Sequence, residues 1–256
     1  MLIGIDASRV ARARRTGTEA YSLRLIQALT EAASLHRLRL YTPVQLKSQI
    51  SNLKSQVPNL EVCVIPFPRL WTHLRLAWEL KRRPPDVLFI PAHVMPLVCP
   101  VPTVVTVHDL GYLHYPEAHR PLDRWYLDWT TRRHTRLAAH LIADSQATCA
   151  DLIRTYQADP ARITVVYPGR DESLARVEDP ATIAAVKARY GITGDYLLYL
   201  GTLQPRKNLI RLVEAFSNIK NQTSNIKYPA SNLQLPTSNL QLVLAGQKGW
   251  LCADLF

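Results

Sequence analysis

The 256-residue chain is predicted to be an α/β protein, with a doubly wound parallel sheet followed by the start of a second α/β domain. Short apolar segments recur along the sequence without alternating polar residues, which is typical of strands buried on both faces. Between them lie segments whose apolar residues recur at helical spacing. Because strands and helices alternate, the strands are expected to run parallel.

The elements of the first domain follow from this pattern in chain order. Strands are expected at 2–6, 37–41, 60–65, 86–90, 103–107, 140–143 and 163–166. Helices are expected at 17–31, 70–82, 122–139 and 146–156. Gly17 opens the first helix, and the pair Pro84 and Pro85 follows the second. Ser145 is a suitable N-cap for the fourth.

Apolar spacing also predicts which helix faces are buried. The residues concerned are Tyr21, Leu25, Ala28 and Leu29 in the first helix, and Trp71, Leu74 and Trp78 in the second. Trp125 and Trp129 lie one helical turn apart in the third, beside several arginines. We interpret these two tryptophans as core residues, with RNA or membrane binding as the alternative.

A linker is predicted where the periodic pattern stops. Residues 168–180, PGRDESLARVEDP, contain two prolines and six charges and have no apolar period. We therefore expect a first domain at 1–167 and a second domain at 181–256. The second begins with a helix at 181–190.

The centre of the second domain is the segment YLLYLGTLQPRKNLIRLVEAF, residues 196–216. An apolar run, 196–200, predicts a buried parallel strand, and Leu209, Leu212, Val213 and Phe216 predict a helix face, with Asn208 as its N-cap. Residues 217–239 then repeat Ser-Asn-Ile or Ser-Asn-Leu and contain prolines that exclude a continuous helix. We interpret them as a low-complexity insertion before a strand at 240–245.

Charge and composition limit the function classes. The net charge of +11 is compatible with nucleic acid, an anionic membrane surface or a phosphorylated substrate, and nucleic-acid binding is supported by charge alone. No apolar run is long enough to span a membrane, and residues 2–5 are too short for a signal peptide, so a cytoplasmic protein is expected. The four cysteines form no CxxC motif, so neither a metal site nor a disulfide is expected.

Arg206 and Lys207 are the first candidate site residues. They lie between a strand and a helix, at the carboxyl end of the strand and the amino end of the helix. Ligands of open α/β sheets bind at this edge, and helix N-termini favour phosphates. The pair therefore predicts an anion site with a diphosphate as the expected ligand, although solvated charge in a loop explains the pattern equally well.

Further candidates follow strands of the first domain. Gly17, beside Thr16, would let a ligand approach a helix N-terminus, although a simple turn also explains it. His108 and Asp109 follow a strand directly and could bind a sugar or position a reacting group, although a structural histidine is the commoner case. Helix capping accounts for the Asp144-Ser145 pair.

Together these segments resemble the retaining glycosyltransferases of family 4, which have the GT-B fold. The matching segments are GIDASRVARARRTGTEAY, TVVTVHDLGYLHYPE, HLIADSQATCADL, ITVVYPGRD, YLLYLGTLQPRKNLIRLVEAF and LVLAGQKGW. They span the chain apart from the predicted insertion and are most similar to mannosyltransferase-like enzymes of bacterial polysaccharide assembly. The nucleotide-sugar epimerases that share this fold fit the segments less well.

The resemblance implies two Rossmann-like domains and a role for each candidate residue. Arg206 and Lys207 would hold the diphosphate of a GDP- or UDP-linked sugar, and Gly17 would approach the same diphosphate. His108, with Asp109, would act at the donor sugar. Thr16, Tyr21 and Ser145 are candidate sugar or acceptor contacts. The acceptor would be a glycan or a lipid-linked molecule, no metal is expected, and the basic helices suit an anionic membrane surface.

The resemblance also implies a longer second domain that supplies a pair of glutamates to the donor. No glutamate follows Glu214 here, so we expect the second domain of this chain to be incomplete. The expected function is sugar transfer with retention in polysaccharide or cell-envelope glycan synthesis. The alternative is a truncated remnant that binds phosphate or sugar ligands without turnover.

Overall fold

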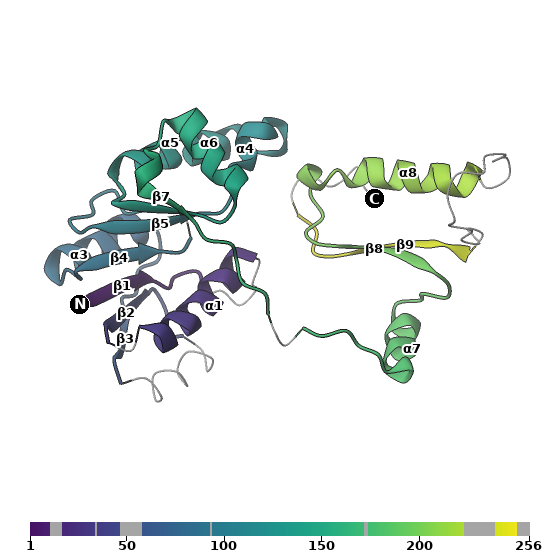
Figure 1. Ribbon diagram of the computed structural model, residues 1–256, viewed down its shortest axis with the longest axis horizontal. Helices are drawn as coiled ribbons and strands as arrows, with labels where there is room; N and C mark the ends of the chain where they lie inside the picture. The colour runs from purple at the N-terminus through teal and green to yellow at the C-terminus, as the bar shows by residue number, and fades with distance from the viewer. Residues whose placement is uncertain are drawn as a thin grey trace. The chain divides into compact units, whose positions relative to one another are not determined.

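The computed structural model describes residues 1–10, 17–33, 35–46, 58–92, 94–171, 174–222 and 239–249. They form two compact units (Figure 1). Unit 1 comprises Met1–Pro116 and Arg120–Gly169, and unit 2 comprises Glu117–His119 and Arg170–Phe256. The chain passes from one unit to the other at Gly169, within the stretch that sequence analysis interprets as a linker.

Unit 1 is built on a sheet of seven strands in the order β3-β2-β1-β4-β5-β6-β7. Every neighbouring pair is parallel. The strands are β1 (Leu2–Asp6), β2 (Arg37–Thr42), β3 (Leu60–Val64), β4 (Val87–Ile90), β5 (Thr103–Val107), β6 (His140–Ala143) and β7 (Ile163–Val165). The predicted parallel α/β fold is confirmed, and the strand order is that of a doubly wound sheet.

Helices cover both faces of this sheet (Figure 1). They are α1 (Gly17–Ala32), η1 (Thr72–Leu76), α3 (Ala77–Arg82), α4 (Gly111–His114), η2 (Pro116–Ala118), α5 (Pro121–Leu137), α6 (Gln146–Tyr156) and η3 (Pro160–Arg162). The helix α1 lies on one side of the sheet, whereas α5 and α6 lie on the other. Two separate apolar clusters result, one on each face.

Alternating side chains of the central strands supply both clusters. Leu88 and Ile90 of β4 point to the α5–α6 side, and Phe89 points to the α1 side. Burying each such side chain stabilises the fold by about 1.5–3 kcal/mol. Because β4 has apolar side chains on both faces, it is stable only where both faces are covered, which is at the centre of the sheet and not at its edge.

The helix predicted at 70–82 has a different form. Leu70 has a positive φ of 54°, and a π-helical turn, η1, precedes the α-helix α3. In this turn Leu76 N–H donates to the carbonyl of Trp71, five residues earlier. The wider turn changes which side chains face the sheet, so Trp71 is buried as predicted, whereas Leu74 and Trp78 are about half exposed.

The buried face of α1 was predicted correctly only in part, since Leu25 and Leu29 pack against the apolar cluster on this side of the sheet. Leu23 and Ile26 are buried, whereas Tyr21 and Leu25 are partly buried and Ala28 is exposed. The buried face includes Ser22 and Thr30, whose hydroxyls donate to carbonyls of the same helix. That satisfies their hydrogen bonds without water, so polar residues that periodicity assigned to the surface are buried.

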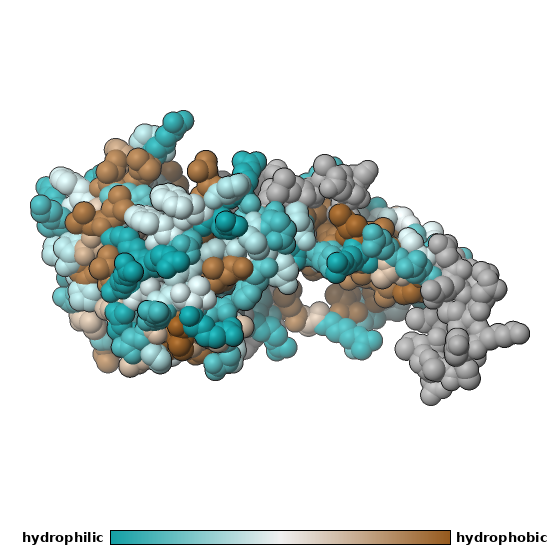
Figure 2. Space-filling view, turned by 90° about the horizontal axis from the view of Figure 1, so that it is seen from above, coloured by the Kyte–Doolittle hydropathy of each residue, from teal (hydrophilic) through white to brown (hydrophobic). Residues whose placement is uncertain are grey.

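Trp125 of α5 is not a core residue, because 64% of its surface is exposed. Trp129 is partly buried, and the two indoles are stacked with their centroids 6.4 Å apart. Seen from the side on which α5 and α6 lie, apolar groups stand among hydrophilic ones (Figure 2). The core prediction for this pair is therefore wrong for Trp125.

Unit 2 consists of α7 (Pro180–Arg189), β8 (Tyr196–Leu200), η4 (Pro205–Lys207), α8 (Leu209–Gln222) and β9 (Gln241–Ala245). The two strands pair in parallel, as predicted. The strand β8 is not buried, since Leu198 is 56% and Leu200 78% exposed among the described residues. On α8, Leu209 is buried and Leu212 partly buried, and the helix continues to Gln222, inside the stretch interpreted as an insertion.

Gly4 of β1 provides a test of the packing of unit 1. A methyl group at this position would lie 2.8 Å from Cε2 of Tyr41 and 2.9 Å from Cγ of Pro85. We expect Gly4→Ala to lower the free energy of unfolding by roughly 1–3 kcal/mol in urea denaturation, because a buried tyrosine must move. Gly169→Ala, where an added methyl group meets nothing within 4 Å, is the control. Equal stability of both variants would contradict the packing described.

Candidate functional site

The parallel sheet places the carboxyl ends of four neighbouring strands along one edge. Strands β1 and β4 are neighbours in the sheet although β2 and β3 lie between them in sequence, so the direction of winding reverses there. Ligands of open α/β sheets bind outside the carboxyl ends of the strands at such a point. The residues at or just after these ends are Asp6 of β1, Pro91 after β4, His108 after β5 and Asp144 after β6.

His108 connects three of these strand ends. Its Nε2 lies 2.9 Å from the carbonyl oxygen of Pro91, and its Nδ1 lies 3.3 Å from Oδ2 of Asp144. The ring of Tyr21 packs edge-on against the imidazole, with centroids 4.8 Å apart and planes at 87°. The imidazole is therefore held on three sides, and its side chain is still 19% exposed.

The partners of His108 also limit its protonation. A carbonyl oxygen can only accept, so Nε2 carries a proton. The Asp144 contact then needs a second proton, either on Nδ1 or on the carboxyl group. Burial raises the pKa of Asp144, although the His108 ring acts to lower it. An imidazole beside a carboxyl group is an arrangement that can serve as an acid or a base.

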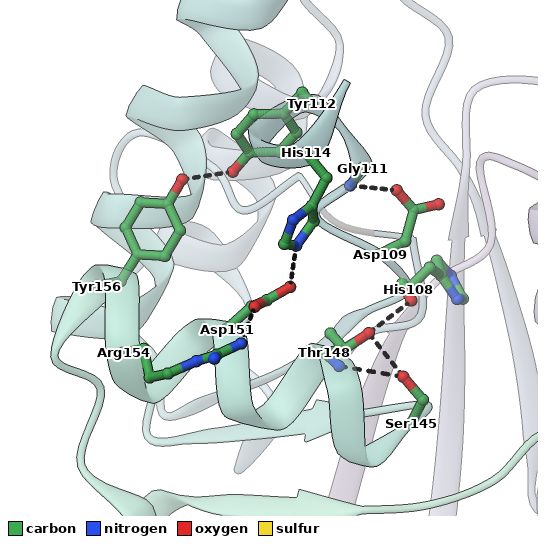
Figure 3. A network of polar contacts seen from close by, with 10 residues as sticks. All are labelled: His108, Asp109, Gly111, Tyr112, His114, Ser145, Thr148, Asp151, Arg154 and Tyr156. Atoms are coloured by element: carbon green, nitrogen blue, oxygen red, sulfur yellow. Dashed lines mark hydrogen bonds and ion pairs between the residues drawn. The ribbon is translucent and has the colours of Figure 1, made fainter. Parts of the chain in front are cut away.

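Asp109 and Ser145 have structural contacts beside this cluster (Figure 3). Asp109 Oδ1 accepts the N–H of Gly111, 2.9 Å away, and so fixes the start of α4. Ser145 Oγ caps α6 by accepting the N–H of Thr148, and Thr148 Oγ1 donates to the carbonyl of His108. These two candidates therefore position His108 and its loop in this structure.

The remaining predicted residues of unit 1 are Gly17, Thr16 and Tyr21. Gly17 is the first residue of α1 and is exposed, with nothing within 4 Å of an added Cβ. Thr16 lies outside the described residues. Tyr21 contacts His108, and burial is the main reason that its pKa is raised, with Asp144 adding to the effect. The Tyr21 hydroxyl thus stays protonated and can donate to a ligand.

Two acidic residues of the first strand–helix unit escaped the sequence analysis. Glu19 of α1 is buried, and Nη1 of Arg9 lies 3.8 Å from its carboxylate. Asp6 is also buried, and it accepts the N–H of Ser8 at 2.9 Å. Burial raises the pKa of Asp6 above 3.8, although Ser8 and Arg9 act to lower it. In the sequence, only the position of Asp6 at the end of an apolar strand could have indicated that it belongs to the site.

The cationic residues of unit 2 follow the ends of β8 and β9. Arg206 and Lys207 form the short turn η4, and Lys207 is exposed. Asn208 ends this turn with a φ of 52°, which is not the extended conformation of an N-cap, so its predicted capping role is not supported by its backbone.

Lys248 is a third cation at this edge. The N–H of Leu203 donates to the carbonyl of Gln247, and Leu203 and Lys248 form a parallel bridge that extends the β8–β9 pair. A Cβ on Gly246 would overlap the carbonyl oxygen of Gly201, so the two loops approach closely. The sequence could have indicated Lys248, since it follows a predicted strand just as Arg206 does.

The described residues contain neither a metal-binding cluster nor a membrane-spanning helix. No group of three or more His, Cys, Asp or Glu side chains in the described part of the chain could hold a metal ion. No helix among the same residues has the length and apolar character needed to cross a bilayer.

The family of the protein follows from comparison with known proteins. Residues 15–174 match the model of glycosyltransferase family 4, which is more than half of the chain. The chain belongs to glycosyltransferase family 4. The match contains the His108 cluster and most of unit 1. The predicted family is thereby confirmed.

Individual relatives agree with this assignment. The chain is 25% identical over 251 residues to O-antigen chain mannosyltransferase B of Escherichia coli, covering 92% of this chain and 61% of that protein. It is 35% identical over 85 residues to a D-inositol 3-phosphate glycosyltransferase of Nocardioides, covering 32% of this chain and 18% of that one. The chain thus spans less than two thirds of these relatives.

A solved structure supports the fold. Anabaena Alr3699/HepE, in complex with UDP and glucose, superposes with a TM-score of 0.60 and 17% identity. The superposition covers 97% of this chain and 61% of that protein. At this identity the likeness concerns the fold alone, and the expected GT-B class is confirmed.

The burial of Asp6 leads to a test of pH dependence. A carboxyl group whose pKa is raised on folding is least costly when protonated, so its cost to the folded state appears as the pH rises through that pKa. We expect Asp6→Asn to raise the free energy of unfolding at pH 7 and to have no such effect below pH 3.8, the ordinary pKa of the group. Urea denaturation at several pH values measures this. A difference that does not change with pH would contradict it.

Proposed function

We propose that this protein transfers a sugar from a nucleotide-diphosphate sugar to a glycan or a lipid-linked acceptor, with retention of configuration. The observation that carries the proposal is the cationic edge of unit 2, where Arg206, Lys207 and Lys248 follow adjacent parallel strands. Guanidinium and ammonium groups pair well with phosphate oxygens. The UDP and glucose bound to the Anabaena protein support a nucleotide-linked donor, the mannosyltransferase relative supports mannose as one candidate sugar, and we propose GDP or UDP as the nucleotide.

The proposed reaction breaks the bond between the anomeric carbon of the sugar and the diphosphate oxygen. The nucleoside diphosphate leaves with the bonding electrons, and an acceptor oxygen forms the new bond on the same face of the sugar. The acceptor proton passes to an oxygen of the leaving phosphate. Negative charge therefore develops on that phosphate, and cations placed around it lower the barrier electrostatically. Because lysine and arginine offer this charge, we propose that no metal ion is required.

Unit 1 would supply the groups that face the sugar and the acceptor. His108 lies 3.3 Å from the carboxylate of Asp144, and an imidazole so placed would contact a sugar hydroxyl or stabilise a developing oxyanion. Asp109, Ser145 and Tyr21 would hold the imidazole in place through the contacts described above. Gly17 and Thr16 would lie near the diphosphate, as the family resemblance implies. The two domains, 1–167 and 181–256, would thus divide the acceptor and donor functions.

Nucleotide binding tests the donor site directly. We expect isothermal titration with UDP and GDP to show binding that Arg206→Ala weakens about tenfold or more, since a charge-assisted contact to phosphate is lost. Lys248→Ala should act in the same direction. Lys220→Ala removes a cation from the last turn of α8, away from the strand ends, and is the control. If all three variants bind UDP and GDP as tightly as the wild-type protein does, the proposed donor site is wrong.

Product analysis separates the two functions considered. With a nucleotide sugar and a glycan acceptor, sugar transfer that Arg206→Ala and His108→Ala both reduce would support the transferase. Donor binding without transfer would instead support the alternative, a protein that binds phosphate or sugar ligands without turnover.

A contact with an anionic membrane is a second part of the proposal. The Trp78 surface comprises Leu70, Leu74 and Trp78, all at least half exposed, together with Arg75 and Arg82. The two guanidinium carbons lie 4.8 and 5.2 Å from the centre of the Trp78 ring. Apolar and aromatic groups flanked by arginines suit the interface of an anionic bilayer. A cytoplasmic protein at the inner face of a membrane would reach a lipid-linked acceptor in this way.

Cosedimentation with vesicles tests the Trp78 surface. We expect the protein to bind phosphatidylglycerol vesicles, and Trp78→Ala to weaken this binding several-fold, because the exposed aromatic anchor is lost and Arg75 and Arg82 lose the ring that they lie over. Binding should fall with added salt and be weak with phosphatidylcholine. Tyr167→Ala, at an exposed tyrosine of the same unit, is the control. Unchanged binding of Trp78→Ala would exclude this surface.

A further inference from the structure

A pocket of about 420 Å³ lies beside α4 and α5 in unit 1, apart from the strand-end cluster. A volume of this size is within the range of small-molecule sites. Two prolines, a leucine and two aromatic rings supply most of its wall, and an arginine and an aspartate supply the polar part. The lining residues are Tyr112, Leu113, Pro116, Pro121, Arg124, Trp125 and Asp128.

The polar part of the pocket is held by a network of hydrogen bonds. The hydroxyls of Tyr112 and Tyr156 lie 2.7 Å apart, as Figure 3 shows. Tyr156 donates in turn to Oδ1 of Asp128 at 2.8 Å, and Nε of Arg132 donates to Oδ2 at 2.8 Å. The side chain of Asp128 is therefore held through both carboxylate oxygens, by Tyr156 on one side and by Arg132 on the other.

Asp128 is ionised and can accept further bonds. Burial acts to raise its pKa, but the bonds from Arg132 and Tyr156 outweigh it and hold the pKa below the ordinary value. A carboxylate offers about four lone-pair positions. Three of them are used, by Tyr156 and by Nε and Nη2 of Arg132, so the side chain keeps capacity for one further hydroxyl donor in the pocket.

The apolar part presents a flat aromatic face. Trp125 is 64% exposed, and its ring is stacked on Trp129 at an interplanar angle of 14°. Stacking fixes the orientation of the indole without covering it. The exposed surface of this indole is available to an apolar face of a ligand.

We propose that this pocket binds a sugar residue of the acceptor glycan. A pyranose ring has an apolar face of C–H groups and a rim of hydroxyls, so it matches a wall with an indole on one part and fixed charged groups on another. The carboxylate of Asp128 would accept hydroxyl protons, and Arg124 would donate to ring or hydroxyl oxygens. The proposal rests on the proposed transferase function, since it identifies where unit 1 holds the acceptor.

The chain connects this pocket to the strand-end cluster through one short segment. His108 and Tyr112 are four residues apart, and Asp109 fixes the turn between them by its bond to Gly111. A glycan held against Tyr112 thus lies on the same β5–α4 connection as the imidazole. The pocket would recognise a sugar of the acceptor other than the one that reacts.

Titration of a neutral trisaccharide without nucleotide tests this proposal. We expect mannotriose to bind to the protein and to quench tryptophan fluorescence, and Trp125→Ala to weaken the binding roughly tenfold. Asp128→Asn keeps the size of the side chain and removes its charge, and should weaken binding as well. Tyr167→Ala is the matched control, because Tyr167 is 65% exposed in the same unit and lies outside the pocket.

The outcomes distinguish this proposal from the donor site. Unchanged mannotriose affinity in Trp125→Ala and Asp128→Asn, or no binding to the wild-type protein, overturns the sugar pocket. A loss of vesicle binding in Trp125→Ala, with mannotriose binding unchanged, also overturns it and assigns the surface to the membrane. UDP affinity, measured with the same variants, tests the proposed function separately, since Arg206 and not Trp125 controls it.

Discussion

Parallel pairing of β1 with β4, of β4 with β5 and of β5 with β6 is the constraint on which the other features of unit 1 depend. It brings His108 beside the carbonyl of Pro91 and the carboxylate of Asp144, residues that are 17 and 36 positions away in sequence. Neither contact can form unless the strands are in register. The apolar residues on both faces of β4 fix that register, because a shift of one residue would exchange the two cores.

The β5–α4 connection couples this edge of the sheet to the helical layer. Within five residues it contains His108, whose ring lies at the strand ends, and Tyr112, whose hydroxyl bonds to side chains of α5 and α6. Asp109 bonds to the backbone between them. A displacement of α5 would therefore reach His108 through few intervening bonds. Such a segment can link recognition of one group of a ligand to the position of another.

The sequence indicated the strands well because most of them are largely apolar, as strands of a sheet covered on both faces are, although Arg37, Arg39 and Glu61 interrupt β2 and β3. It also placed His108 at a strand end. It could not identify Asp144 as the partner of His108, because that contact depends on the order of the strands. Helix capping by Ser145 was also a sufficient explanation of the Asp144-Ser145 pair. The π-helical turn after Leu70 was missed because periodicity assumes a constant number of residues per turn. The strand β8 was predicted as buried because its residues are apolar, but burial depends on what covers them.

Unit 2 shows how binding and stability are connected. Its strands leave apolar side chains such as Leu198 and Leu200 exposed, so the described part has a small core and a small margin of stability. Three cations lie at one edge of that sheet, and because their charges are alike they repel one another in the folded unit. An anion bound there would reduce this repulsion and stabilise the folded unit by RT ln(1 + L/Kd), where L is the free anion concentration. The same residues would therefore determine both the affinity for a diphosphate and the stability of the unit that binds it.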